Sequence, residues 1–146
     1  MIRIRKALSG DMENILIFLQ DNDSEDKDID NNDDCFVYYD NDMLLGCGIS
    51  FAKGDYCFIN NIIVAERFRR SKVGTAIAKT ILNSYECNGA KYALCWRRCN
   101  GFCESLGFRS TAADELPVSV RDMLHDQGNI KSLYFVSLEG YFKGCG

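Results

Sequence analysis

The sequence predicts an α+β domain built on a mixed β-sheet, and three observations lead to this prediction. Strands and helices are expected in the order β-α-β-β-β-α-β-α-β. The segment 56–96 contains a strand, a helix and a second strand, which is the arrangement of a parallel β-α-β crossover. The chain has 146 residues, of which 47% are hydrophobic, enough to form one compact core. We therefore expect residues 1–146 to form a single domain.

The chain is expected to begin with a strand, a helix and an acidic loop. Residues 2–5 alternate apolar and basic side chains as a strand does, and the apolar spacing of residues 12–19 suits an amphipathic helix with a polar cap at 9–11. Segment 21–34 then holds eight acidic residues and one lysine, a net charge of -7, within a chain whose total charge is -4. This density of like charges favours a solvated loop and leaves the rest of the chain mildly basic.

The middle of the chain is rich in β-branched and aromatic residues. Three apolar runs separated by short polar turns predict an antiparallel meander of strands at 35–39, 43–51 and 56–64. A helix is expected next, at 72–86, because Val73, Ile77 and Ile81 recur every four residues before Asn88-Gly89 ends the pattern.

The C-terminal part is expected to complete the sheet. Its composition predicts a strand at 91–96, a short helix at 100–106 that ends at Gly107, and a last strand at 131–138, followed by a short tail at 139–146. The only histidine, His125, is expected to be an exposed helix residue. No repeat or linker interrupts this order, which agrees with a single domain.

Eight cysteines occur without a metal-binding pattern. There is no C-x-x-C pair, and Cys95, Cys99 and Cys103 cannot share a helix face if Cys95 belongs to a strand. An EF-hand loop begun at Asp21 would place Asp26 at the required glycine and Asn32 at the bidentate glutamate. We expect no bound metal and reduced, mostly buried thiols.

Composition also limits the partners and the location of the protein. No run of eighteen apolar residues occurs, and acidic residues follow the basic N-terminus before an apolar region could reach the length of a signal peptide. We expect a cytoplasmic protein that does not enter a membrane. No dense stripe of lysine and arginine is present, so nucleic acid is not an expected partner, whereas a small anion is.

A basic turn precedes the second predicted helix. Arg69, Arg70 and Lys72 lie directly before the point where unpaired backbone N–H groups and the positive end of the helix dipole would point outward. Such a helix N-terminus is an anion site, and a diphosphate would be a natural occupant. The alternative is that these cations form a solvated loop without a ligand.

Two motifs resemble those of the GNAT superfamily of N-acetyltransferases. Residues 69–74 match the family's cofactor motif, Arg/Gln-x-x-Gly-x-Gly/Ala after a strand ending in valine, except that Lys72 stands at the first glycine. Residues 102–108 resemble the family's aromatic-Tyr-Glu-x-Leu-Gly-Phe segment, with Cys103 at the tyrosine. The resemblance covers about residues 2–138.

This resemblance implies a twisted mixed sheet, flanked by helices and splayed between the strands at 56–64 and 91–96, with acetyl-CoA in the gap. The pantetheine arm would bind the backbone of three strand residues, Ile62, Ile63 and Val64. The pyrophosphate would bind the following turn and helix start, formed by Arg69, Arg70, Ser71, Lys72, Val73, Gly74 and Thr75. Asn100 would contact the cofactor near the short helix. The strand residues can serve the core as well, because their side chains and their backbone have separate roles.

The resemblance also implies a mechanism, direct attack of an amine on the thioester, with backbone N–H groups stabilising the oxyanion. Cys103 is a candidate proton donor to the leaving thiolate, because a thiol has an ordinary pKa of about 8.5. The alternative is that Cys103 is a buried apolar side chain. No general base is evident, since Asn60 and Asn61 occupy the region where some relatives have a glutamate, so the amine would enter neutral or lose its proton through water.

The acceptor is predicted less sharply than the donor. The C-terminal third resembles the N-acetylglutamate synthase and amino-acid acetyltransferase branch, which implies a small amino acid or related amine, with Arg97 or Arg98 as carboxylate partners. The acidic segment 21–34 leaves a polyamine or a protein or peptide N-terminus as an alternative. A domain that binds acyl-CoA without turnover is a second alternative, and a homodimer is also left open.

Overall fold

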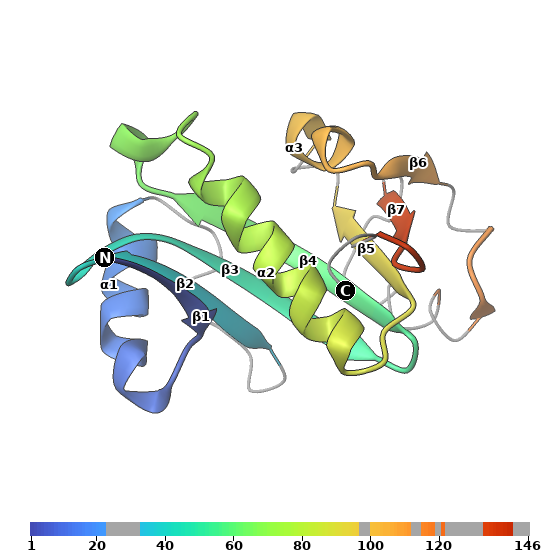
Figure 1. Ribbon diagram of the computed structural model, residues 1–146, viewed down its shortest axis with the longest axis horizontal. Coiled ribbons are helices and arrows are strands. Elements are labelled where there is room, and N and C mark those ends of the chain that lie inside the picture. The colour runs from blue at the N-terminus through green and yellow to red at the C-terminus, as the bar shows by residue number, and fades with distance from the viewer. Residues whose placement is uncertain (23–32, 97–99, 112–114, 119–120, 122–132, 142–146) are drawn as a thin grey trace.

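The computed structural model describes residues 1–22, 33–96, 100–111, 115–118, 121 and 133–141. Its centre is a seven-stranded sheet in the order β1-β2-β3-β4-β5-β7-β6 (Figure 1). The strands are β1 (Ile2–Lys6), β2 (Asp34–Asp40), β3 (Met43–Lys53), β4 (Tyr56–Val64), β5 (Tyr92–Trp96), β6 (Arg109–Thr111) and β7 (Leu133–Ser137). The helices are α1 (Met12–Asp21), α2 (Val73–Cys87) and α3 (Asn100–Ser105), with 3-10 turns at Ser9–Asp11 and Glu66–Phe68.

The sheet is mixed, as expected. Strands β4 and β5 pair in parallel and α2 connects them, whereas every other pair of neighbouring strands in the described part of the chain is antiparallel. The antiparallel meander β2-β3-β4 and the crossover through α2 are therefore confirmed. None of the helices in the described part of the chain is long and apolar enough to cross a membrane.

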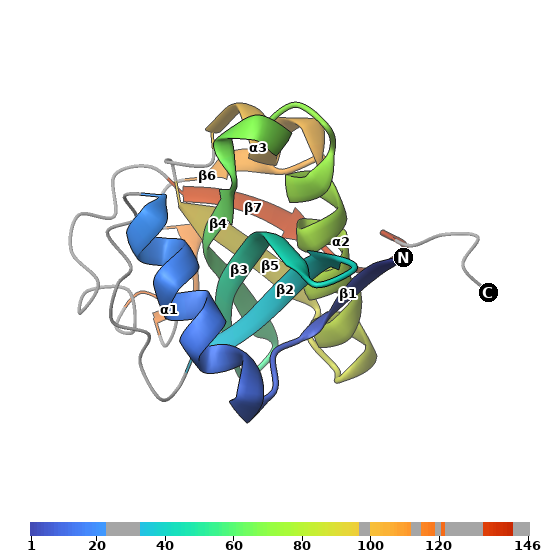
Figure 2. The ribbon, with the colours of Figure 1, turned by 90° about the vertical axis from the view of Figure 1, so that its left-hand side faces the viewer.

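Helices cover both faces of the sheet (Figure 2). On one face, α2 contributes Ile77, Ile81 and Leu82 to a buried cluster that includes Phe36 of β2. On the other face, α1 packs its own apolar side against the sheet, where Val37 of β2 is buried. Neighbouring residues of β2 thus serve opposite faces, as the two-residue period of a strand requires.

Two glycines of β3 allow α2 to lie close to the sheet. A Cβ atom on Gly48 would lie 2.6 Å from Ile81 Cδ1 and 2.8 Å from Ile77 Cγ2, and one on Gly46 would lie 2.9 Å from Ile77 Cδ1. The close approach of α2 fixes its N-terminus relative to the end of β4, and this is the region that carries the candidate site.

A buried carboxylate ties β1 to the start of α1. Asp11 accepts hydrogen bonds from Arg5 (2.6 and 3.1 Å), from the backbone N–H of Leu8 (2.7 Å) and from the Tyr39 hydroxyl (3.2 Å). The hydrogen bond from Arg5 is the main reason that the pKa of Asp11 falls to about 2. Asp11 is the N-cap residue of the first helix, within the expected cap, but its side chain makes no capping hydrogen bond to that helix and instead anchors it to β1 and β2.

The structure adds a strand that the sequence does not predict. Strand β6 has only three residues, two of them exposed, so it lacks the alternation that identifies longer strands, and its pairing with β7 stabilises it instead. The second helix begins at Val73, one residue later than expected, because Lys72 is its N-cap. Residues 23–32 of the acidic segment and His125 lie outside the described residues.

Candidate active site

Strands β4 and β5 separate at the centre of the sheet. Their parallel pairing runs from Tyr56–Tyr92 to Ile59–Cys95 and stops there, while β4 continues to Val64, and Figure 1 shows the two strands diverging. The register between β3 and β4 shifts at the same place, which makes Asn60 the extra residue of a β-bulge. The C-terminal part of β4 therefore has a strand neighbour on one edge, β3, and none among the described strands on the other.

The backbone groups of β4 alternate between these two edges. The N–H of Ala65 donates to Leu45 of β3 at 2.8 Å, so Ile63 also faces β3, whereas Ile62 and Val64 face the open edge. Two hydrogen bonds agree with this phase: Arg69 Nε donates to the Val64 carbonyl (3.2 Å), and the Ile62 N–H donates to Asn61 Oδ1 (2.9 Å). Of the three expected pantetheine contacts, Ile63 thus directs its backbone to β3, and its side chain packs in the cluster under α1.

The chain turns sharply between β4 and α2. The Ser71 hydroxyl donates to the Phe68 carbonyl, which closes the turn. Arg70 and Lys72 both have left-handed backbone conformations, with φ of 75° and 67°. Glycine adopts this conformation without the steric cost that other residues pay. Lys72 stands where the resembled motif has its first glycine, and its φ gives a physical reason for that glycine.

A pocket of about 280 Å³ lies where the turn meets α2. It is lined by Val64, Phe68, Arg69, Arg70, Lys72, Gly74 and Thr75. The first backbone hydrogen bond of α2 runs from Ala76 to Lys72, so the N–H groups of residues 73–75 have no acceptor within the helix. These donors, the helix dipole and three cationic side chains in one pocket fit a phosphate-bearing ligand.

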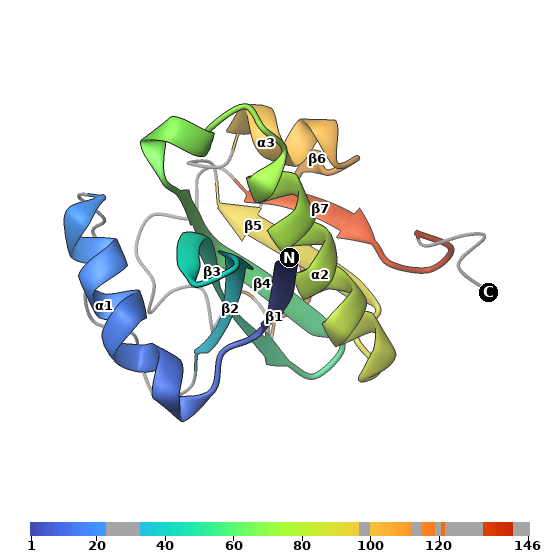
Figure 3. The ribbon, with the colours of Figure 1, turned by 60° about the vertical axis from the view of Figure 1, so that its left-hand side comes forward.

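The expected site residues are only partly brought together. Five of the seven expected pyrophosphate contacts line the pocket, whereas Ser71 uses its hydroxyl within the turn and the Val73 side chain is buried in the core. Asn100 begins α3, but its side chain lies outside the described residues, as do Arg97 and Arg98. Figure 3 shows the turn and α3 at the same end of the molecule.

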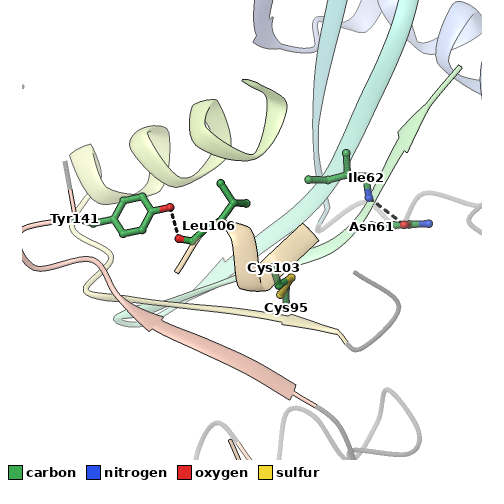
Figure 4. Close-up of a disulfide and its surroundings, with 6 residues drawn as sticks. All are labelled: Asn61, Ile62, Cys95, Cys103, Leu106 and Tyr141. Carbon is green, nitrogen blue, oxygen red and sulfur yellow. Dashed lines mark hydrogen bonds between the residues drawn. A yellow bond between two sulfur atoms is a disulfide. The ribbon is translucent and has the colours of Figure 1, made fainter. Parts of the chain in front are cut away.

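Cys103 forms a disulfide with Cys95 (Figure 4). Both residues are almost completely buried, and the bond joins α3 to β5 where β4 and β5 separate. This pair corrects the expectation of reduced thiols, and in this form Cys103 has no thiol proton to give. Cys95 lies in β5 and Cys103 in α3, so they share no helix face, as expected, but α3 returns over β5 and brings the two sulfurs together. The other described cysteines, Cys35, Cys47, Cys57 and Cys87, are not disulfide-bonded.

Sequence reasoning missed two contributors to this region. Phe68 lines the pocket, and the Asn61 side chain binds the Ile62 N–H at the open edge of β4. The available signal was the pair Asn60-Asn61, two consecutive amides within an otherwise apolar strand. The Tyr141 hydroxyl donates to the Leu106 carbonyl (2.7 Å) and anchors the last described residues to the turn that follows α3 (Figure 4).

Solved structures with the same fold include enzymes with different acceptors. N-acetylglutamate synthase from Neisseria gonorrhoeae, complexed with coenzyme A and N-acetyl-glutamate, has a TM-score of 0.72 and 19% identity over 94% of this chain and 35% of its own. This chain thus spans about a third of that protein. Diaminobutyrate acetyltransferase from Paenibacillus lautus, complexed with L-2,4-diaminobutyric acid and coenzyme A, has a TM-score of 0.65 and 16% identity over 100% and 99% of the two chains. The ribosomal-protein-S18-alanine N-acetyltransferase from Escherichia coli has a TM-score of 0.62 and 16% identity over 94% and 93%.

The family is shown by a direct match of the sequence. No curated protein matches the chain significantly. The model of the acetyltransferase (GNAT) domain, however, matches residues 31–110, more than half of the chain, including β4, the basic turn, α2 and α3. The seven-stranded mixed sheet agrees with the fold of the solved GNAT enzymes. The chain therefore belongs to the GNAT family of acetyltransferases.

Proposed function

We propose that this protein transfers an acetyl group from acetyl-CoA to the primary amine of an amino acid or a related small amine, by direct attack. One observation supports this most strongly: a cationic pocket at the N-terminus of α2 adjoins the open backbone edge of β4. The pocket suits a pyrophosphate, and the open edge suits an extended chain that carries amide groups.

Several residues would hold the donor. Arg69, Arg70 and Lys72 would bind the phosphates together with the N–H groups at the start of α2, and Ile62 and Val64 would offer their backbone to the pantetheine arm. When bound, acetyl-CoA supplies an acyl group activated as a thioester. The N–H of Ile62 faces the open edge and would polarise the acyl carbonyl.

Proton transfer would depend on the acceptor and on Cys103. Asn60 and Asn61 are amides and cannot take a proton from an ammonium group. The acceptor would therefore react as the neutral amine, and the rate would rise with pH until the amine is deprotonated. The amine nitrogen would bond to the acyl carbon while the carbon–sulfur bond breaks, and the amine's proton would reach the leaving sulfur through water or through the reduced Cys103 thiol.

A small acceptor is favoured by the resemblance of the C-terminal third to amino-acid acetyltransferases. The N-acetylglutamate synthase and the diaminobutyrate acetyltransferase with the same fold act on amino acids. The S18-alanine enzyme acts on a protein, so a protein N-terminus and a polyamine are the acceptors against which the proposal must be tested.

The first experiment is a thermal melt of the reduced protein with acetyl-CoA. A ligand at about 100 times its Kd stabilises the folded state by about 2.7 kcal/mol, which raises the Tm by several degrees. Turnover is then followed by mass spectrometry with three sets of amines: amino acids, polyamines and short peptides. We expect a shift and acetylation of amino acids. Preference for peptides or polyamines would overturn the acceptor, a shift without turnover would favour a binding domain, and no shift at millimolar acetyl-CoA would contradict the proposal.

A further inference from the structure

The inference concerns Asn61 and rests on the proposed function. The Asn61 side chain accepts the N–H of Ile62, its own neighbour, at 2.9 Å. The backbone phase of β4 directs this N–H to the open edge, away from β3. Figure 4 shows the Asn61 and Ile62 side chains leaving β4 in opposite directions, with Asn61 pointing away from Cys95 and Cys103. A backbone donor of the open edge that suits an acyl carbonyl is thus held by a side chain.

The chemistry of this hydrogen bond makes it exchangeable. A half-buried backbone N–H needs an acceptor, and an amide oxygen on a short side chain satisfies it in the free protein. Another carbonyl oxygen arriving along the open edge can take the same place. An asparagine displaced in this way keeps both an acceptor oxygen and an NH₂ donor close to the position that it has left.

We propose that Asn61 is a positioning residue for acetyl transfer. It holds the Ile62 N–H while no acyl group is present and gives up this donor to the acyl carbonyl. Its side-chain oxygen then accepts one N–H of the incoming amine, which orients the nitrogen toward the acyl carbon. Asn61 donates no proton to the reaction and takes none from it.

The first test compares two ligands that differ only in the acyl carbonyl. Asn61→Ala removes the competing oxygen, so its affinity for acetyl-CoA should rise about fivefold, the size of one ordinary hydrogen bond, with unchanged affinity for CoA. Asn61→Asp places a carboxylate on the same N–H and binds it more firmly, so acetyl-CoA should bind more weakly relative to CoA. The matched control is Asn83→Ala on the exposed side of α2, which should alter neither affinity.

The second test needs no ligand. Hydrogen exchange of the Ile62 amide, followed by NMR in the free protein, should become about fivefold faster in Asn61→Ala and stay unchanged in Asn83→Ala. The third test is kinetic, because Asn61→Ala should lower both the KM for acetyl-CoA and kcat, the latter about tenfold. A purely structural role would not lower KM.

The outcomes separate this inference from the proposed function. If Asn61→Ala changed the affinities for CoA and acetyl-CoA equally, or left the hydrogen-exchange rate of the Ile62 amide unchanged, the role of Asn61 would be overturned. The acetyltransferase proposal would still stand. If the unmodified protein bound neither CoA nor acetyl-CoA, the proposed function would fail, and the role of Asn61 would fail with it. Faster hydrogen exchange of the Ile62 amide in Asn61→Ala, together with tighter binding of acetyl-CoA and unchanged binding of CoA, supports the inference.

Discussion

The guanidinium of Arg69 donates to the carbonyl of Val64 through Nε at 3.2 Å, which ties the pocket to the last residue of β4. The same side chain lines the pocket, so its remaining N–H groups are available to a phosphate. One residue therefore connects the two parts of the proposed donor site.

Arg69→Ala should weaken binding of acetyl-CoA by 10- to 100-fold, because a hydrogen bond to a charged group contributes about 1.5–3 kcal/mol. The matched control is Arg67→Ala, which removes the same charge from a side chain that lies over the Phe68 ring at 5.5 Å and does not line the pocket. Calorimetric titration of both variants measures the difference. Equal losses would mean that only the net charge of the turn matters.

Lys72 combines an unfavourable backbone conformation with a favourable charge. Lys72→Gly should raise the free energy of unfolding by up to about 1 kcal/mol, because glycine accepts φ of 67° at no steric cost. Lys72→Ala keeps the Cβ atom and should not stabilise the protein. If the ammonium binds phosphate, both variants should lose a similar three- to tenfold in CoA affinity, and the loss should shrink at high salt. Tighter binding by Lys72→Gly would show that the lysine obstructs the site.

The redox state of Cys103 should control its use as a proton donor. In the disulfide with Cys95 it has no thiol, so reductant should raise the rate of the unmodified protein. Cys95→Ser keeps Cys103 reduced and should be active without reductant. Cys103→Ala should be slower by about 100-fold, the lower range for general acid catalysis. A Cys103→Ala rate equal to that of the reduced protein would show that the thiol gives no proton.

Asp11 should make the free energy of unfolding depend on pH in the acid range. Its pKa is lowered to about 2, mainly by the hydrogen bond from Arg5, so its contribution is complete above the ordinary value of 3.8 and is lost as the pH falls toward 2. Urea unfolding should show Asp11→Asn to be less stable than the unmodified protein at pH 6, with a difference that narrows by about 1 kcal/mol near pH 2, after allowance for solvent screening. A constant difference would mean that the hydrogen-bond geometry, and not the charge, stabilises this junction.

Gly48 should be intolerant of a side chain. Gly48→Ala places a Cβ atom 2.8 Å from Ile77 Cγ2 and should destabilise the protein by about 1–3 kcal/mol. Ile81→Val removes the Cδ1 atom that would lie 2.6 Å away, so the double variant should recover part of the loss. Gly10→Ala, which meets nothing within 4 Å, is the control and should be nearly neutral. Chemical denaturation of the four variants measures these changes in the free energy of unfolding.

The sequence predicted those elements whose side chains repeat with a clear period. The four-residue spacing of Val73, Ile77 and Ile81 identified α2, and the apolar runs identified the meander. Strand β6 has no such period and depends on its partner β7. The Cys95–Cys103 pair depends on how α3 returns over β5, a tertiary property that residue spacing does not encode.

The sequence predicted the motif of the candidate site, but not which backbone groups of β4 face the open edge. The basic residues of the turn carried the prediction of an anion pocket, and Arg69, Arg70 and Lys72 do line one. Whether Ile62 or Ile63 faces the open edge depends on the register with β3, which the bulge at Asn60 changes. The register between β3 and β4 cannot be predicted from composition.

The separation of β4 and β5 also divides the sheet mechanically. The strands on either side of it, β1 to β4 and then β5, β7 and β6, are paired in the described residues by the short ladder from Tyr56–Tyr92 to Ile59–Cys95, with α2 as the covalent connection. A ligand bound along the C-terminal part of β4 would extend this junction and connect the two parts of the sheet. Under the proposed function, ligand binding would therefore be thermodynamically linked to the rigidity of the C-terminal half, because the ligand would hold the two halves of the sheet together.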